Sequence, residues 1–535
     1  MALSPGARLA LATLVVTAAT LSPAGPAQAG APATTADRPA ADAMTYKSLP
    51  NGTRSTKTLV IGVDGAAFDV LAKTELPRLK SLMTSGMTGT GNLYAAPLAG
   101  TYSGPGWSSI ATGVWPDKHR VTDNNFSGAA FDKYPDYSTR LEAADPAFST
   151  LVVGNWPEIS TDVFGAKTDL RLMGDDDTAT TATAADYLRN GNPDSVFVHL
   201  DEVDLAGHMS GSASAEYTAA LKQADRRIGR LLDAVAARSR HAKEDWLVLV
   251  TADHGHTPLG GHGGNTPGER KTFVIARGKG IPAGSVRHDV KITDIAPTVL
   301  AHQGVTPSPA WNLDGKAIPA LAPDAFDSLR GSLKPRADET RPGADVKGWT
   351  TTPPKGWTVD NSRTPAGGVT EWRGWSFATD EFWTNTQLGQ GREANVRARN
   401  VFAVADSDEW DDRRHDAGRF DSTLISPDHQ LISAAPVTVG YASHYRLAGP
   451  QTGEVYAVWD DGEPVLVKSY RNAVNTYEKL RLTPPRGAST LQLRFRYTGA
   501  NSAFWTVDQV TVRQGVSWPG VDIPLTAVAR TAIGH

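Results

Sequence analysis

Short, nearly continuous apolar runs constrain the fold of this chain more than any other feature of its sequence. They occur in TKTLVIGVDGA, FSTLVVGNW, DSVFVHLDEVD, DWLVLVTADHG and KTFVIARG. Such runs are typical of strands that are buried on both faces of a sheet. Helical patterns lie between them, most clearly over residues 212–240, where apolar residues recur at steps of three and four. The alternation predicts an α/β domain with a mostly parallel sheet flanked by helices, at residues 57–330.

A different pattern follows the α/β segment. Residues 331–347 are rich in Pro, Gly and charge, which predicts a linker. Residues 348–518 alternate apolar and polar side chains, as in STLQLRFRYTG, with turn residues about every ten positions. We therefore expect an all-β sandwich of the jelly-roll type as a second domain.

The N-terminal sequence MALSPGARLALATLVVTAATLSPAGPAQAG has a basic start, an apolar core and a small-residue cleavage site. It predicts a signal peptide at residues 1–29, which the Ala-, Thr- and Pro-rich residues 30–56 follow as a flexible leader. Residues 519–535 are expected to form a tail, and no other run predicts a transmembrane segment. We expect a secreted, extracellular protein, and the Ala- and Arg-rich composition favours a bacterial source.

Two properties of the whole chain narrow its chemistry. The chain has no cysteine, which excludes a thiol nucleophile and thiolate metal ligands. Its net charge of −4 argues against broad, charge-driven binding to nucleic acid.

Acidic and imidazole side chains gather at the ends of the predicted strands. In a parallel sheet the carboxyl ends of the strands meet at one edge, so these side chains are expected to converge there. Carboxylates mixed with imidazoles suit zinc in a catalytic setting, and manganese or iron also tolerates this set. The candidate metal ligands are Asp64, Asp204, His208, Asp253, His254 and His262, with Ser103 as a hydroxyl nucleophile among them.

These motifs together resemble the alkaline phosphatase superfamily. They are VDG (63–65), SGPGW…ATG (103–113), DxxxH (204–208), DHG (253–255) and GGHGG (260–264). The segment ATGVWPDKHRVTDNNF (111–126) is similar to the type I phosphodiesterase/nucleotide pyrophosphatase branch.

The resemblance implies a division of roles at two zinc ions. Asp204, His208 and His262 would bind one ion, and Asp64, Asp253 and His254 the other, with Ser103 bridging as nucleophile. Asn124 falls on the asparagine that donates a hydrogen bond to a phosphate oxygen. A divalent cation lowers the pKa of bound water from 15.7 to about 7, and the same polarisation would activate the serine hydroxyl.

The sequence departs from this branch at and near the nucleophile. The branch usually has Thr at position 103, and it has Phe and Asn where this chain has Gly104 and Gly106. Sulfatases of the superfamily carry an Arg where this chain has Trp107, which argues against a sulfatase. Trp107 would either stack on the substrate or pack beneath the nucleophile loop. His119 and His256 match no ligand position, and we interpret both as structural residues near the site.

The second domain offers weaker indications. FDSTLISP (420–427) and FRYTGANSAFWTVDQVTV (495–512) resemble MAM-like jelly rolls, which implies contact with carbohydrate, with the cell surface or with the catalytic domain. A packing role as a lid is the alternative. The acidic segment 406–416 is compatible with Ca²⁺, although a solvated charged loop is the preferred interpretation.

We therefore expect a secreted phosphodiesterase or nucleotide pyrophosphatase that acts on phosphate diesters or nucleotide-type small molecules through a phospho-serine intermediate. A phosphomonoesterase or phosphonate hydrolase on the same site is the first alternative. An inactive, glycan-binding surface protein is the second. A comparison of the turnover rates of a phosphate diester and a phosphate monoester would distinguish the first alternative from the predicted function.

Overall fold

The computed structural model describes residues 48–515 and 522–528, which all belong to one compact unit. The predicted signal peptide (1–29) lies outside the described residues, as do most of the leader and most of the tail. Among the helices of the described ranges, none combines the length and the apolar character that crossing a bilayer requires.

An eight-stranded mixed sheet forms the centre of the α/β region, residues 48–333. Its strand order is β4-β3-β5-β1-β6-β7-β2-β8, and β7 is the strand that runs antiparallel to its two neighbours. This confirms the predicted α/β class with a mostly parallel sheet. The strands are β1 (Thr56–Val63), β2 (Met87–Asn92), β3 (Thr150–Gly154), β4 (Leu170–Met173), β5 (Ser195–Leu200), β6 (Asp245–Thr251), β7 (Lys271–Arg277) and β8 (Ser285–Arg287).

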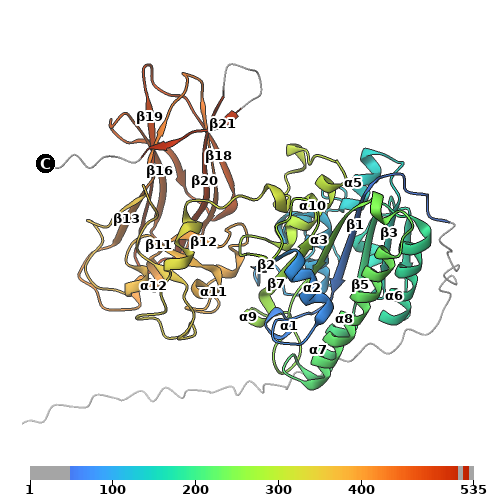
Figure 1. Ribbon diagram of the computed structural model, residues 1–535. Coiled ribbons are helices and arrows are strands. Elements are labelled where there is room, and N and C mark those ends of the chain that lie inside the picture. The colour runs from blue at the N-terminus through green and yellow to red at the C-terminus, as the bar shows by residue number, and fades with distance from the viewer. Residues whose placement is uncertain (1–47, 516–521, 529–535) are drawn as a thin grey trace, which may run out of the picture. The chain divides into compact units, whose positions relative to one another are not determined.

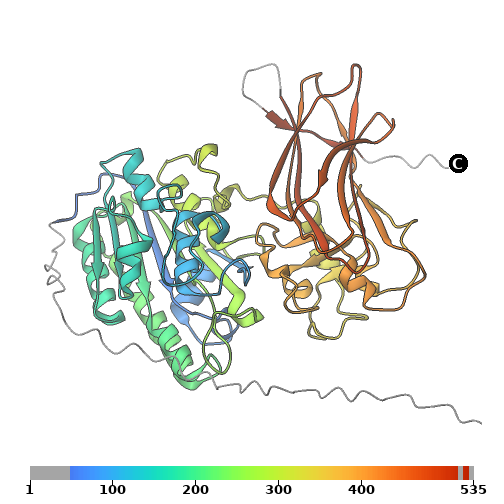
Figure 2. The ribbon, with the colours of Figure 1, turned by 180° about the vertical axis from the view of Figure 1, so that it is seen from behind.

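Helices cover both faces of this sheet. Alternate residues of β1 point to opposite sides: Leu59 and Ile61 pack with α2, α6 and α8, whereas Val60 packs with α3, α5 and α10. Figure 1 shows the first layer in front of the sheet and Figure 2 shows the second from behind. The helices are α1 (Phe68–Leu71), α2 (Pro77–Ser85), α3 (Ser103–Thr112), α4 (Pro116–His119), α5 (Tyr137–Ala144), α6 (Asp177–Asp186), α7 (Glu202–Ser210), α8 (Ala215–Ala236), α9 (Pro267–Arg270), α10 (Ile295–His302), α11 (Asp380–Trp383) and α12 (Ser407–Asp411).

The helix predicted over residues 212–240 is α8. The Ser214 side chain accepts a hydrogen bond from the Tyr217 N–H at 3.0 Å, which satisfies one of the free donors at the helix start. The periodic apolar residues, among them Leu221 and Ile228, are buried against the sheet. Shorter 3₁₀ helices lie at His241–Lys243, Ile292–Asp294, Pro309–Trp311, Ile318–Ala320, Phe326–Ser332, Thr370–Trp372 and Arg392–Ala394, and π-helical turns at Ile159–Val163 and Tyr187–Gly191.

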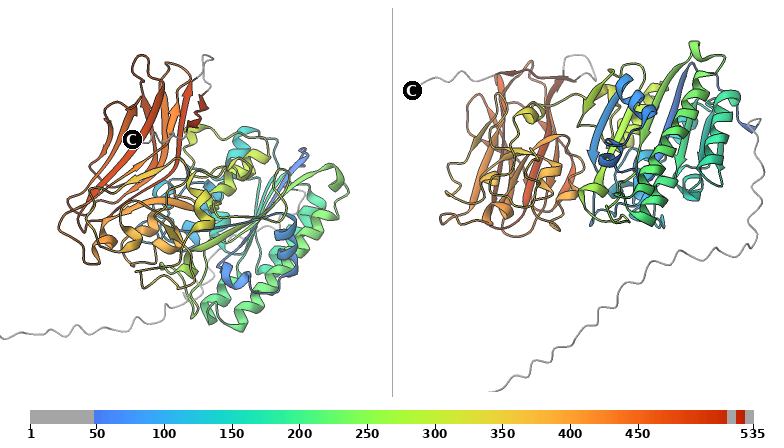
Figure 3. Two further views of the ribbon diagram at one scale, coloured as in Figure 1. Left: turned by 60° about the vertical axis from the view of Figure 1, so that its left-hand side comes forward. Right: turned by 60° about the horizontal axis from the view of Figure 1, so that its bottom comes forward.

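The β region, residues 349–528, consists of two seven-stranded sheets in which every pairing between the named strands is antiparallel. The views in Figure 3 show these strands as a separate stack of sheets. The all-β class of this region is therefore confirmed, while its jelly-roll connectivity stays a prediction. The strands are β9 (Trp349–Thr350), β10 (Thr358–Asp360), β11 (Ser376–Thr379), β12 (Val401–Asp406), β13 (Phe420–Ile425), β14 (Asp428–Gln430), β15 (Val437–Tyr445), β16 (Thr452–Trp459), β17 (Val465–Tyr470), β18 (Val474–Leu482), β19 (Thr490–Gly499), β20 (Phe504–Gly515), β21 (Asp522–Pro524) and β22 (Ala527–Val528).

Two buried arginines of the β region form ion pairs with carboxylates of the α/β region. Arg399 binds Asp294 through two nitrogens, at 2.7 and 2.8 Å. Arg397 donates to Asp314 at 2.9 Å and to both carboxylate oxygens of Asp117. Because both arginines, Asp294 and Asp314 are buried, each of them needs an opposite charge beside it, whereas Asp117 is exposed.

Candidate active site

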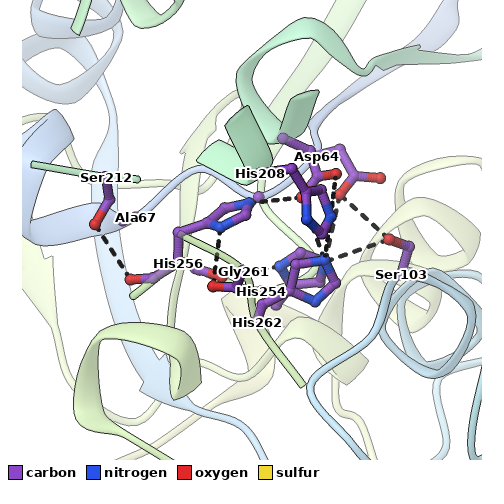
Figure 4. Close-up of polar contacts among 12 residues, drawn as sticks. Asp64, Ala67, Ser103, His208, Ser212, His254, His256, Gly261 and His262 are labelled. Carbon is purple, nitrogen blue, oxygen red and sulfur yellow. Dashed lines mark hydrogen bonds and ion pairs between the residues drawn. The ribbon is translucent and has the colours of Figure 1, made fainter. Parts of the chain in front are cut away.

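Strand order brings the first predicted ligands together at the carboxyl edge of the sheet. Asp64 directly follows β1, and Asp253 and His254 lie just beyond β6, which pairs with β1. Ser103 is the first residue of α3 and is 7% exposed. Figure 4 shows Asp64, Ser103 and His254 together with His208 and His262.

The serine hydroxyl faces two of these groups. Ser103 Oγ lies 3.4 Å from Asp64 Oδ1 and 3.3 Å from His254 Nε2. His254 Nε2 is also 3.2 Å from Asp253 Oδ2. The Asp253 Oδ2 atom is buried and has no hydrogen-bond partner among the described residues. One predicted ligand trio, Asp64, Asp253 and His254, therefore forms a compact group beside the nucleophile.

The second trio is also compact, but its backbone differs from the sequence expectation. We expected Asp204 at a strand end, yet β5 ends at Leu200 and Asp204 lies in the first turn of α7. His208 is one turn further along the same helix, so the four-residue spacing places both side chains on one face. His208 Nε2 is 3.2 Å from Asp204 Oδ2 and 2.9 Å from His262 Nε2.

Three imidazoles of the site have the same orientation. His254, His256 and His262 each place Nδ1 within 3.1 Å of a backbone carbonyl oxygen, that of Gly255, Gly261 and Thr101 respectively. A carbonyl oxygen only accepts, so Nδ1 of each ring carries a proton.

The Nε2 atoms of these rings face other polar groups of the site. His256 Nε2 is 2.7 Å from Asp204 Oδ1, and His262 Nε2 is 3.5 Å from the same oxygen. Burial lowers the pKa of His262 to about 3 and also lowers the pKa of His254, so protonation of these rings is disfavoured. Acceptors that face one another without protons require a cation between them.

The carboxylates point to the same conclusion. Burial raises the pKa of Asp253 well above its ordinary value, and the neighbouring charges of Asp64 and Asp204 add to this effect. Oxygen and imidazole nitrogen ligands at these separations fit zinc, manganese or iron. In the described part of the chain, three groups have ligand atoms within 4.8 Å of one another: Asp204/His254/His256/His262, Asp64/Asp253/His254 and Asp64/His199/Asp201.

Two residues of these groups were missed by the sequence analysis, and a third was underestimated. His199, near the end of β5, and Asp201 were not predicted as site residues. His256 was interpreted as structural, although its ring lies within the first group. The only sequence signal for His199 is a histidine inside an otherwise apolar strand.

His199 and Trp107 contact the same carboxylate oxygen of Asp64. His199 Nε2 and Trp107 Nε1 both lie 2.9 Å from Asp64 Oδ2. With two N–H donors on Oδ2, the other oxygen of Asp64 is the one that faces Ser103. The Trp107 side chain is 0% exposed, so the predicted stacking of Trp107 on a substrate does not occur. Its indole packs beneath the nucleophile, as the alternative interpretation expected.

Glycines allow the nucleophile helix to approach its neighbours. A Cβ atom at Gly106 would lie 2.7 Å from Cβ of Asp253, and one at Gly104 would lie 2.6 Å from the carbonyl oxygen of Asp123. The Gly104 N–H donates to Asn124 Oδ1 at 2.8 Å. Asn124 is exposed, and its Nδ2 group has no hydrogen bond within the described ranges. Asn124 therefore lies beside the start of α3 with an amide donor available.

In the acidic segment 406–416 of the β region, an arginine side chain already provides the positive charge. Arg392 lies 3.1 Å from Asp406 and 2.7 Å from Glu409, and Asp406 also caps α12. The guanidinium supplies the positive charge that Ca²⁺ would bring. The calcium prediction therefore gains no support from the structure.

An α/β sheet with carboxylates and imidazoles around one serine at its carboxyl edge is the arrangement of the alkaline phosphatase superfamily. Residues 58–396 match the family model described as type I phosphodiesterase/nucleotide pyrophosphatase. The chain belongs to this family. The match extends past residue 330 into the β region.

Individual relatives are distant. Ectonucleotide pyrophosphatase/phosphodiesterase family member 3 of Rattus norvegicus is 25% identical over 228 residues, which cover 38% of this chain and 25% of the relative. A venom phosphodiesterase of Macrovipera lebetinus is 23% identical, covering 38% and 26%. The chain thus spans about a quarter of the length of these relatives. Human ectonucleotide pyrophosphatase/phosphodiesterase 5 has a TM-score of 0.38 at 13% identity, covering 47% of this chain and 96% of that one.

Proposed function

We propose that this chain is a secreted phosphodiesterase or nucleotide pyrophosphatase with two zinc ions and a Ser103 nucleophile. The observation that carries the proposal is that Nε2 of His254 and of His262, two rings whose protonation is disfavoured, faces carboxylate oxygens beside Ser103 Oγ. Family membership supports the reaction class. The predicted signal peptide supports secretion, and the Cys-free ligand set supports zinc.

Each of the two metal ions would have its own set of three protein ligands. Asp64, Asp253 and His254 would bind one ion, and Asp204, His208 and His262 would bind the other. When bound, zinc supplies the Lewis acidity that lets a serine hydroxyl act as a nucleophile near neutral pH.

The reaction itself needs few further groups. Ser103 Oγ forms a bond to phosphorus as the bond between phosphorus and the leaving ester oxygen breaks, and the serine proton passes through solvent to that oxygen, which departs as an alcohol or a nucleotide. Water then cleaves the Oγ–P bond and restores the hydroxyl. Asn124, next to the Gly104 N–H, would donate its free amide to a phosphate oxygen as charge develops.

Two variants of the same helix test the nucleophile. Ser103→Ala should abolish hydrolysis of bis-p-nitrophenyl phosphate and leave the metal content, measured by elemental analysis, unchanged. Ser108→Ala is the matched control, because Ser108 is fully buried in α3 and its hydroxyl has no partner. Full activity in Ser103→Ala would remove the serine from the mechanism.

The subclass needs a separate comparison. We expect faster turnover of bis-p-nitrophenyl phosphate than of p-nitrophenyl phosphate. A strong preference for the monoester would instead support a phosphomonoesterase or a phosphonate hydrolase. For the β region we propose contact with carbohydrate or the cell surface, which binding to a glycan panel would test.

A further inference from the structure

A cavity of about 90 Å³ lies where β2 ends and β7 begins. Because β2 and β6 are both antiparallel to β7, they are parallel to each other, and Asn92 at the end of β2 lies on the same sheet edge as Asp253. Two strand spacings separate β2 from β6, which is roughly 10 Å. The cavity has room for several water molecules, and therefore for a small oxyanion.

The side chain that most needs a ligand there is Lys291. It lines the cavity and is only 5% exposed. Its ammonium group makes no hydrogen bond or ion pair with any residue in the described ranges. The nearby carboxylates are already engaged: Asp294 binds Arg399, and Asp380 accepts from Arg270 and Asn92.

An unpartnered ammonium group in this position is costly. Burial lowers the pKa of Lys291 to about 8, so most molecules carry the charge at neutral pH. Withdrawing a charge from water without a partner is unfavourable. A bound anion would remove this cost.

The rest of the lining is also basic. Burial lowers the pKa of His288 to about 4, so its ring is neutral at neutral pH. Four cationic side chains then face two carboxylates, and one of the four, Lys271, is also paired with Asp69 at 2.8 Å. The cations are Lys271, Lys291, Arg330 and Lys347, and the carboxylates are Asp380 and Glu381. Arg330 donates only to the neutral Asn400 amide oxygen, so its charge is not paired within the described residues.

We propose that this basic cavity binds a phosphate-type oxyanion, with Lys291 as the principal ligand and Arg330 beside it. The oxyanion is either free phosphate or the phosphate group of a larger molecule. The proposal does not depend on the reaction proposed for Ser103, because it uses none of the candidate metal ligands.

Equilibrium dialysis with radiolabelled inorganic phosphate tests the proposal on the full-length, metal-loaded protein at constant ionic strength. The wild type should bind phosphate in the cavity in addition to any phosphate at the candidate active site. Lys291→Met should remove one phosphate per chain, or weaken its binding at least tenfold. Lys291→Arg should retain most of it. Lys222→Met, an exposed lysine of α8, is the control and should change nothing.

The outcomes separate this site from the active site. Phosphate binding that is the same in the wild type and in a Lys291→Met protein of unchanged circular dichroism would overturn the proposal. Loss of turnover in Ser103→Ala with the Lys291-dependent phosphate retained would support both sites independently. If glycerol phosphate displaces the bound phosphate, the cavity accepts phosphate groups of larger ligands; if it does not, the occupant is the free ion.

Discussion

Replacing His199 by Phe should weaken metal binding at the site without unfolding the protein. The change removes one of the two N–H donors to Asp64 Oδ2, each at 2.9 Å, while Trp107 keeps the other. A hydrogen bond to a charged group contributes about 1.5–3 kcal/mol. Since about 1.4 kcal/mol is a factor of ten in a binding constant, the expected loss is roughly 10- to 100-fold in metal affinity.

The effect on folding stability should be smaller than this. His199 Nδ1 is buried without a partner, so Phe also removes an unsatisfied polar atom, which offsets part of the lost bond. Phe can keep the edge contact that the His199 ring makes with Trp107, at a centroid distance of 5.1 Å. Metal affinity is therefore a more specific measure of the His199 interaction than the melting temperature.

The assay is a competition titration of zinc against a chromophoric chelator, combined with kcat and KM for a diester. His119→Phe is the matched control, because His119 is also fully buried but bonds to Ser109 and to the Val121 N–H, not to a ligand carboxylate. His199→Gln keeps an N–H donor and should recover part of the affinity. A zinc affinity for folded His199→Phe within twofold of the wild type would refute the reasoning.

Three further predictions concern other parts of the molecule. Asn124→Ala should lower kcat/KM by about 10²- to 10³-fold, the usual effect of losing one preorganised donor, and steady-state kinetics would show it; an unchanged value would exclude Asn124 from the reaction. Chelation should abolish hydrolysis and lower the melting temperature, because the carboxylates of Asp64 and Asp253 lose their counter-charge, and added zinc should restore both; hydrolysis that survives chelation would contradict a metal requirement. Lys291 has its pKa lowered from 10.5 to about 8, so in phosphate-free buffer its charge destabilises the fold below pH 8 and ceases to do so as the pH rises to 10.5. Relative to Lys291→Met, the wild type should therefore gain about 3 kcal/mol of unfolding free energy over this range, and equal pH dependence in denaturant melts would contradict the assignment.

The class of the fold and the longest helix follow from local pattern. The continuous apolar run of β5 predicts a buried strand, and the three- and four-residue spacing of apolar residues in α8 predicts a helix. The structure confirms both. The reversed direction of β7 could not be predicted, because a buried strand has the same apolar pattern in either orientation. The direction depends on the connection through residues 252–270, which contains only the short helix α9 before β7.

The sequence predicted those residues of the candidate site that lie within recognisable motifs. Asp64 and His254 converge because the adjacent strands β1 and β6 end together, which the sequence indicates, whereas Ser103 reaches them from the start of α3. The place of Asp204 on α7 was misjudged, although the four-residue spacing to His208 already favoured a helix. His199 was missed because its role arises from a contact across strands that no local pattern records. The assignment of each residue to a particular metal ion stays a prediction.

The buried arginines of the β region affect how this protein can be divided. A fragment ending near residue 330 would keep Asp294 and Asp314, two buried carboxylates, but would lack the guanidinium groups of Arg399 and Arg397. Asp314 would retain its ion pair with Lys118 at 2.8 Å, whereas Asp294 would lose its ion pair with Arg399. Removing one partner of such a pair costs about 3–5 kcal/mol. A transplant of the α/β region should therefore include the β region, or those acids should first be replaced by neutral residues.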